Sequence, residues 1–82
     1  TSKTLKSGQV TLQPGEEIGE HITTKREEIL IVLKGTATIF EGVKKTEVAA
    51  GQTYFIPDEI AHNVCNKGHE ELIYIYVVSL FA

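Results

Sequence analysis

The stretch GEEIGEHITTKREEILIVLKG, residues 15–35, decides how this chain folds. It opens with glycine and charged residues, carries a histidine at position 21, and continues into an apolar run, Ile29 to Leu33, that is closed by Gly35. A short apolar run rich in isoleucine and valine, bounded by turn residues, is typical of a buried β-strand. We therefore expect a strand over residues 28–33.

Two polar side chains near this strand are expected to point inward. Alternate residues of a strand face the same side, so Glu28 shares a face with Leu30 and Val32, and His21 shares one with Thr23. A carboxylate that opens an apolar face is costly to bury unless it is neutralised, and a bound cation would neutralise it. The stretch is therefore either a solvated loop before an ordinary strand or part of a metal site.

The rest of the chain repeats the pattern of short apolar runs separated by turn residues. No apolar spacing of three and four residues persists over two helical turns. Strands are expected near residues 5–12, 18–22, 28–33, 36–41, 43–49, 53–56, 62–65 and 72–81. The tight turns favour antiparallel pairing, and the β-branched and aromatic content favours a sandwich or barrel. The prediction is an all-β fold.

Length, charge and cysteine content narrow the functional classes. The 82 residues fit a single domain over residues 1–82, with a core so small that we expect a homodimer. The net charge of −3 and the scattered Lys and Arg argue against nucleic-acid binding. No apolar run approaches the ~20 residues of a membrane span, so no membrane partner is expected. The single cysteine, Cys65, favours a reducing, cytoplasmic setting.

A second stretch, GQTYFIPDEIAHNVCN, residues 51–66, places another histidine on an apolar strand. Five residues separate Gly51 from Pro57, four separate Pro57 from His62, and three separate His62 from Asn66. His62 shares a strand face with the valine two residues later. It is therefore another polar side chain expected to point inward.

In these two stretches the sequence resembles the cupin family. The first cupin motif is Gly, five residues, His-x-His, three or four residues, Glu, six residues and Gly; the second is Gly, five residues, Pro-x-Gly, two residues, His, three residues and Asn. The residues that match in register are Gly15, His21, Glu28, Gly35, Gly51, Pro57, His62 and Asn66. With residue frequencies of about 5% each, four fixed positions match by chance roughly once in 10⁵ starts.

Two positions depart from these motifs. Thr23 stands where the first motif has its second histidine, which is a metal ligand in the family, and Glu59 stands where the second motif has its glycine. We expect Glu59 to change only the geometry of the turn. Thr23 either hydrogen-bonds a metal-bound water or substrate, or marks a barrel that has lost its metal.

The resemblance implies a jelly-roll barrel, the double-stranded β-helix of the cupins, with His21, Glu28 and His62 as ligands of a divalent metal. Two histidines and one carboxylate with open positions form the set of non-haem Fe(II) oxygenases, and Mn, Ni, Co or Zn also accept it. The function implied is a metal-dependent enzyme, an oxygenase or isomerase, acting on a small-molecule ligand. The alternative is a metal-free barrel that binds a small ligand without chemistry.

Other residues have simpler interpretations. Glu27 is expected outward as a solvated partner of Lys25 or Arg26, although Arg26 could instead lean over the barrel mouth and meet an anionic substrate. Cys65 is expected to pack as a small apolar residue, and His69 to be exposed in a turn.

The aromatic residues Tyr54, Phe55, Tyr74 and Tyr76 are expected in the core, with one tyrosine hydroxyl in the pocket. No nucleophile is paired with a base, and no glycine-rich phosphate loop occurs. Covalent hydrolase chemistry is therefore not indicated.

Overall fold

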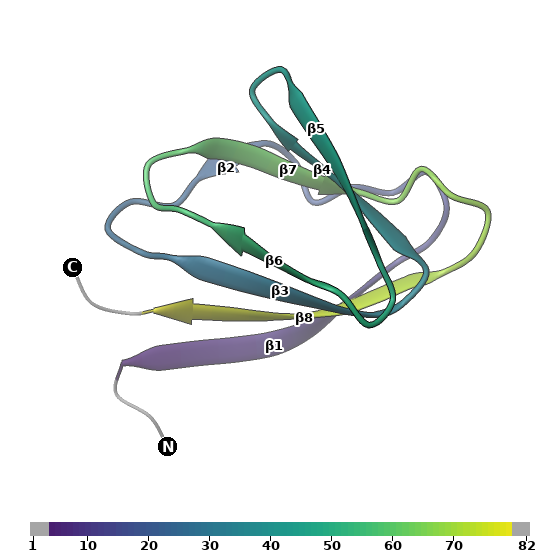
Figure 1. Ribbon diagram of the computed structural model, residues 1–82, viewed down its shortest axis with the longest axis horizontal. Coiled ribbons are helices and arrows are strands. Elements are labelled where there is room, and N and C mark those ends of the chain that lie inside the picture. The colour runs from purple at the N-terminus through teal and green to yellow at the C-terminus, as the bar shows by residue number, and fades with distance from the viewer. Residues whose placement is uncertain (1–3, 80–82) are drawn as a thin grey trace.

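The computed structural model describes residues 4–79, and every regular element in that range is a β-strand. The strands are β1 (Leu5–Leu12), β2 (His21–Ile22), β3 (Glu28–Lys34), β4 (Thr36–Glu41), β5 (Lys44–Ala49), β6 (Thr53–Ile56), β7 (Ala61–Cys65) and β8 (Leu72–Ser79). They pair antiparallel into two four-stranded sheets that face each other, ordered β1-β8-β3-β6 and β2-β7-β4-β5 (Figure 1). This confirms the predicted all-β antiparallel fold.

The predicted strand positions are confirmed, with differences at strand ends. β3 extends to Lys34 and β7 begins at Ala61, each one residue beyond the predicted range. The strand expected over 18–22 is shorter, and only His21 and Ile22 pair. Val43 lies in the turn before β5 and is fully exposed, so the expected start of that strand is wrong by one residue. Residues 80 and 81, expected at the end of the last strand, lie outside the described residues. Over residues 4–79, no helix is present that could cross a membrane.

Strand register gives the barrel two different ends. In the first sheet Leu12 pairs with Leu72 at one end, while Val78 pairs with both Lys6 and Glu28 at the other. We call the end that carries Lys6, Glu28 and Val78 the open end, and the end that carries Leu12 and Leu72 the closed end. Side chains directly opposite each other in a sheet share a face, so the polar residues of the open end are brought together by pairing.

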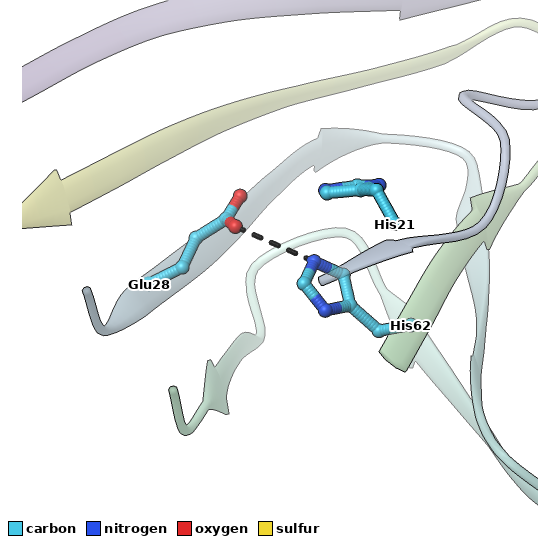
Figure 2. A group of neighbouring side chains, drawn as sticks. All are labelled: His21, Glu28 and His62. Carbon is cyan, nitrogen blue, oxygen red and sulfur yellow. Dashed lines mark ion pairs between the residues drawn. The ribbon is translucent and has the colours of Figure 1, made fainter. Parts of the chain in front are cut away.

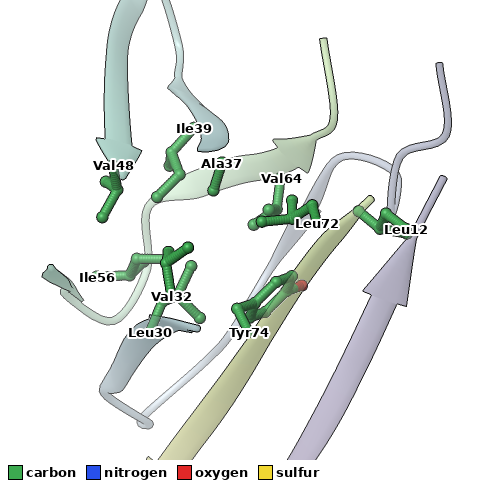
Figure 3. Packing of buried hydrophobic residues seen from close by; sticks show 10 residues of the cluster. All are labelled: Leu12, Leu30, Val32, Ala37, Ile39, Val48, Ile56, Val64, Leu72 and Tyr74. Atoms are coloured by element: carbon green, nitrogen blue, oxygen red, sulfur yellow. The ribbon is translucent and has the colours of Figure 1, made fainter. Parts of the chain in front are cut away.

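The space between the two sheets is filled by apolar side chains (Figure 3). The core consists of Leu12, Leu30, Val32, Ala37, Ile39, Val48, Ile56, Val64, Leu72 and Tyr74. Burying a side chain of this kind contributes about 1.5–3 kcal/mol each, which offsets the entropy lost in ordering the chain. Alternation along each strand explains the set, because every second residue of β3, for example, faces the core.

The closed end is held by one polar residue, Asn66, which is 1% exposed. Its side-chain nitrogen donates to the carbonyl oxygens of Leu12 (2.9 Å) and Glu70 (2.8 Å), and its side-chain oxygen accepts from the Gly68 amide (3.0 Å). Its own carbonyl accepts from the Gly15 amide at 2.8 Å. Asn66 therefore connects three chain segments, and both polar atoms of its side chain form hydrogen bonds.

Two turns depend on left-handed backbone. Gly35, between β3 and β4, has φ +77°, and a Cβ there would lie 2.5 Å from the Glu71 carbonyl oxygen. Glu59 has φ 64°, and its amide donates to the Thr23 carbonyl at 2.9 Å. Glu59 thus keeps the backbone conformation that favours glycine, whereas the sequence led us to expect an altered turn.

The predicted core aromatics are only partly confirmed. Tyr74 is 3% exposed, and Tyr54 and Tyr76 are partly buried against the core. Phe55 is 51% exposed, so its predicted core position is wrong. The reason is alternation in β6, where Tyr54 and Ile56 take the inward positions. Cys65, at 4% exposed, is buried as expected, and His69 is exposed as expected.

Candidate metal centre

Three predicted site residues meet at the open end (Figure 2). His21 and His62 are cross-strand partners in β2 and β7, and Glu28 reaches them from β3 in the facing sheet. The imidazole rings lie 4.2 Å apart at 63°, and Nε2 of His62 lies 3.7 Å from Oε1 of Glu28. One potential ligand atom from each residue falls within 4.8 Å of the others. Closure of the barrel thus gathers residues that are far apart in the sequence.

Both histidine rings are held in the same way. Nδ1 of His21 lies 3.0 Å from the Gly19 carbonyl oxygen, and Nδ1 of His62 lies 2.9 Å from the Ile60 carbonyl oxygen. A carbonyl oxygen only accepts, so each Nδ1 must carry the proton. In the neutral rings each Nε2 then keeps its lone pair. Metal-binding histidines are usually oriented by such a contact at the other ring nitrogen.

His62 presents a buried acceptor without a donor. Its side chain is 1% exposed, and its Nε2 has no hydrogen-bond partner among residues 4–79. It faces the Glu28 carboxylate, which also accepts and lies beyond hydrogen-bond distance at 3.7 Å. That separation is shorter than the maximum of about 4.2 Å between two atoms that each lie about 2.1 Å from one metal ion, so both atoms could bind the same ion. Two acceptors that face each other in this way fit a shared cation.

The electrostatics of Glu28 agree with this arrangement. Its side chain is 14% exposed, and burial raises the pKa of its carboxyl group above the ordinary value, while His62 and His21 act in the opposite direction. A carboxylate that is desolvated and only partly compensated gains from a positive charge next to it. A divalent cation between the two histidines and Glu28 would supply that charge.

A cavity of about 270 Å³ opens from this cluster towards solvent. Thr23 and Arg26, the two residues considered for contact with a substrate, both line it. Two tyrosines, Tyr74 and Tyr76, contribute to the wall, where one was expected. Glu27 is exposed, as expected. The cavity lining therefore combines apolar side chains with the histidine–glutamate cluster, Thr23 and two cations.

Sequence reasoning missed two polar residues near the cluster. Lys6 lines the cavity, and alternation could have placed it there because it shares a strand face with the buried Leu12. Glu41 is the cross-strand partner of His62 on its other side. Its carboxylate accepts a hydrogen bond from the Tyr54 hydroxyl and lies 3.9 Å from Lys44 Nζ, so it serves the contact between the sheets.

Comparison with known proteins agrees with this architecture. The family model described as "Cupin domain" matches residues 8–78. The chain belongs to the cupin family. No curated protein matches the sequence. Cupins commonly bind a metal, and this cupin has a histidine–glutamate–histidine group that could hold one.

Several solved structures share the fold. The protein TT1209 from Thermus thermophilus has a TM-score of 0.90 and 20% identity, with 100% of this chain and 78% of that chain covered. A predicted oxalate decarboxylase from Thermotoga maritima has a TM-score of 0.88 and 25% identity, covering 96% and 69%. A double-stranded β-helix protein from Klebsiella pneumoniae has a TM-score of 0.88 and 23% identity, covering 95% and 69%. This cupin therefore has the predicted double-stranded β-helix fold.

Proposed function

We propose that this cupin is a metal-dependent enzyme that acts on a small molecule, with His21, Glu28 and His62 as the metal ligands. The observation that carries the proposal is the buried Nε2 of His62, which lacks a donor and faces a carboxylate. A structural histidine would be expected to satisfy this atom, because an unsatisfied buried acceptor costs about 1–3 kcal/mol. The similarity to a predicted oxalate decarboxylase at 25% identity supports small-molecule chemistry.

Each part of the site has a distinct role in this proposal. A bound divalent metal would supply Lewis-acid polarisation or, if it is iron, oxygen chemistry. The Gly19 and Ile60 carbonyls hold the histidines with Nε2 towards the cavity. Glu28 brings the negative charge, and Thr23, which lines the cavity, would hydrogen-bond a substrate or water there. The apolar walls limit the access of bulk water to the substrate.

The second candidate is a metal-free module that binds a small ligand. Thr23 favours it, because it stands where the cupin motif has a further histidine ligand. Ligand binding that persists unchanged after chelation would support this candidate. Substrate turnover that depends on added metal would contradict it.

Metal analysis of protein purified without a histidine tag or chelator tests the proposal. The wild type, His62→Ala and the control His69→Ala would be loaded separately with Fe(II), Mn(II), Ni(II) and Zn(II). We expect about one metal per chain in the wild type and in His69→Ala, because His69 is exposed in a turn. In His62→Ala the affinity should fall by about 100-fold or more, since even the residues that orient ligands are worth 10–100-fold.

Equal metal content in the wild type and His62→Ala would contradict the proposal. If metal is lost as expected, substrates would be screened under air and under nitrogen. Turnover that needs air would indicate an oxygenase, and equal turnover in both would indicate an isomerase or another reaction without oxygen.

A further inference from the structure

We propose that the ligand of the open-end cavity is a small organic carboxylate, recognised by Lys6 and Arg26. This inference deepens the proposed function, and rests on it, because it concerns the same cavity. The two cations come from separate parts of the chain, Lys6 from β1 and Arg26 from the loop before β3, and both line the cavity.

The charge of the cavity is opposite to that of the chain. The protein carries a net charge of −3, yet the cavity lining contains Lys6 and Arg26 against a single carboxylate, Glu28. A metal bound at Glu28 would make the local charge more positive. A concave site of one sign concentrates ligands of the opposite sign. An acidic protein with a basic cavity is therefore suited to an anion.

Neither Lys6 nor Arg26 forms an ion pair with another residue in the described range 4–79. Among residues 4–79, ion pairs join Lys34 to Glu71 and Lys44 to Glu41, whereas Lys6 and Arg26 take part in none. Arg26 offers a planar pair of donors that matches a carboxylate, and Lys6 offers a mobile point charge. Both groups are available at the mouth for a ligand.

The size and walls of the cavity select the rest of the ligand. At about 270 Å³ it is smaller than the range of about 300–1,000 Å³ typical of drug-sized ligands. Val10, Val78 and Tyr76 supply apolar lining in the same cavity as the cations. A short carbon chain fits this lining while its carboxylate meets the cations.

Calorimetry with defined probes tests this inference. The probes are acetate, oxalate and succinate, with succinamide as the neutral counterpart of succinate and inorganic phosphate as a different anion. They would be titrated into the wild type, Arg26→Gln and Lys6→Gln. The matched controls are Lys25→Gln, next to Arg26 but outside the cavity lining, and Lys45→Gln on an exposed position of β5.

We expect at least one carboxylate to bind more tightly than succinamide and phosphate, with an affinity that falls as salt is added. Arg26→Gln and Lys6→Gln should each weaken that binding by about fivefold or more, and the controls by less than twofold. Absence of binding by all the carboxylates, tighter binding of phosphate, or equal binding by the cation variants would overturn the inference. Metal content would be measured on the same samples to separate carboxylate recognition from the proposed metal binding. Loss of carboxylate binding with metal retained would contradict only this inference. Absence of metal with carboxylate binding retained would contradict only the proposed function.

Discussion

His62 lies near the start of β7 and Asn66 directly follows its end, four residues later, and each is 1% exposed. They differ in how their polar atoms are satisfied. Asn66 at the closed end donates twice and accepts once. His62 at the open end makes one hydrogen bond and leaves Nε2 without a partner among residues 4–79.

This difference separates a structural role from a functional one. The hydrogen bonds of Asn66 are all to backbone groups of its own chain, so its contribution is to the stability of the barrel. Nε2 of His62 makes no hydrogen bond within residues 4–79, and in the proposed function it would bind a cation. We therefore expect substitutions of these two residues of one cupin motif to differ in their effect on the stability of the metal-free protein.

The largest effect is expected for Asn66→Ala. It removes both donors to the Leu12 and Glu70 carbonyls and the acceptor for the Gly68 amide. Leaving these groups unsatisfied should lower the free energy of unfolding by roughly 3 kcal/mol or more. Urea denaturation measures this loss. Asn63→Ala is the control, since its hydrogen bonds to Gly19 and Glu17 are less buried, and an equal loss in both variants would contradict the prediction.

The substitution His62→Leu tests the contrast between His62 and Asn66 most directly. Leucine is similar in volume and removes the unsatisfied acceptor, so the metal-free protein should change in stability by no more than about 1 kcal/mol. The measurement is urea denaturation with a chelator present. A loss as large as that of Asn66→Ala would show that His62 is a structural residue and would remove the basis of the comparison.

Glu28 should make the free energy of unfolding of the metal-free protein depend on pH. Its pKa in the folded protein is raised above the value of 4.5, first by burial, so the folded state holds the proton more tightly than the unfolded state. The free energy of unfolding should therefore fall as pH rises from about 4.5 through the raised pKa. Glu28→Gln should lack this component and be more stable than the wild type above that range.

Urea denaturation of both proteins between pH 4 and 8, with chelator, measures the difference. A difference in stability that does not vary with pH would contradict the assignment. Added Zn(II) should reverse the order, because the wild type would then gain the free energy of metal binding.

The smallest effect is expected at the turn between β6 and β7. Glu59 has φ 64°, a conformation that costs a side-chain-bearing residue roughly 1–2 kcal/mol and costs glycine little. Glu59→Gly should raise the free energy of unfolding by up to about 1 kcal/mol, since the extra freedom of glycine in the unfolded chain offsets part of the gain. Thermal unfolding measures it, and Asp58→Gly, next to it, should be destabilising. A loss in Glu59→Gly would mean that its side chain stabilises the turn.

Local sequence was sufficient to predict most of the strands, and the resemblance to the cupin motifs predicted the three-residue cluster. Alternation with a period of two depends only on neighbouring residues, so the inward positions of Glu28 and His62 could be read from their apolar neighbours. The motif spacing then identified His21, Glu28 and His62 among several histidines and many acids. The same alternation of inward and outward residues, counted from the correct residue of each strand, would have placed Lys6 inward and Phe55 outward.

Tertiary structure decided the features that depend on contacts between distant segments. No spacing shows that the Gly19 and Ile60 carbonyls accept from the two histidines, because those contacts follow from how the loops lie after the barrel closes. The convergence of Lys6 and Arg26 on one cavity is likewise a product of strand pairing. The sequence by itself determined which residues point inward, since that is local geometry. Only the folded barrel decided which of them meet, and which buried polar atom is left for a ligand, since those depend on packing between the sheets.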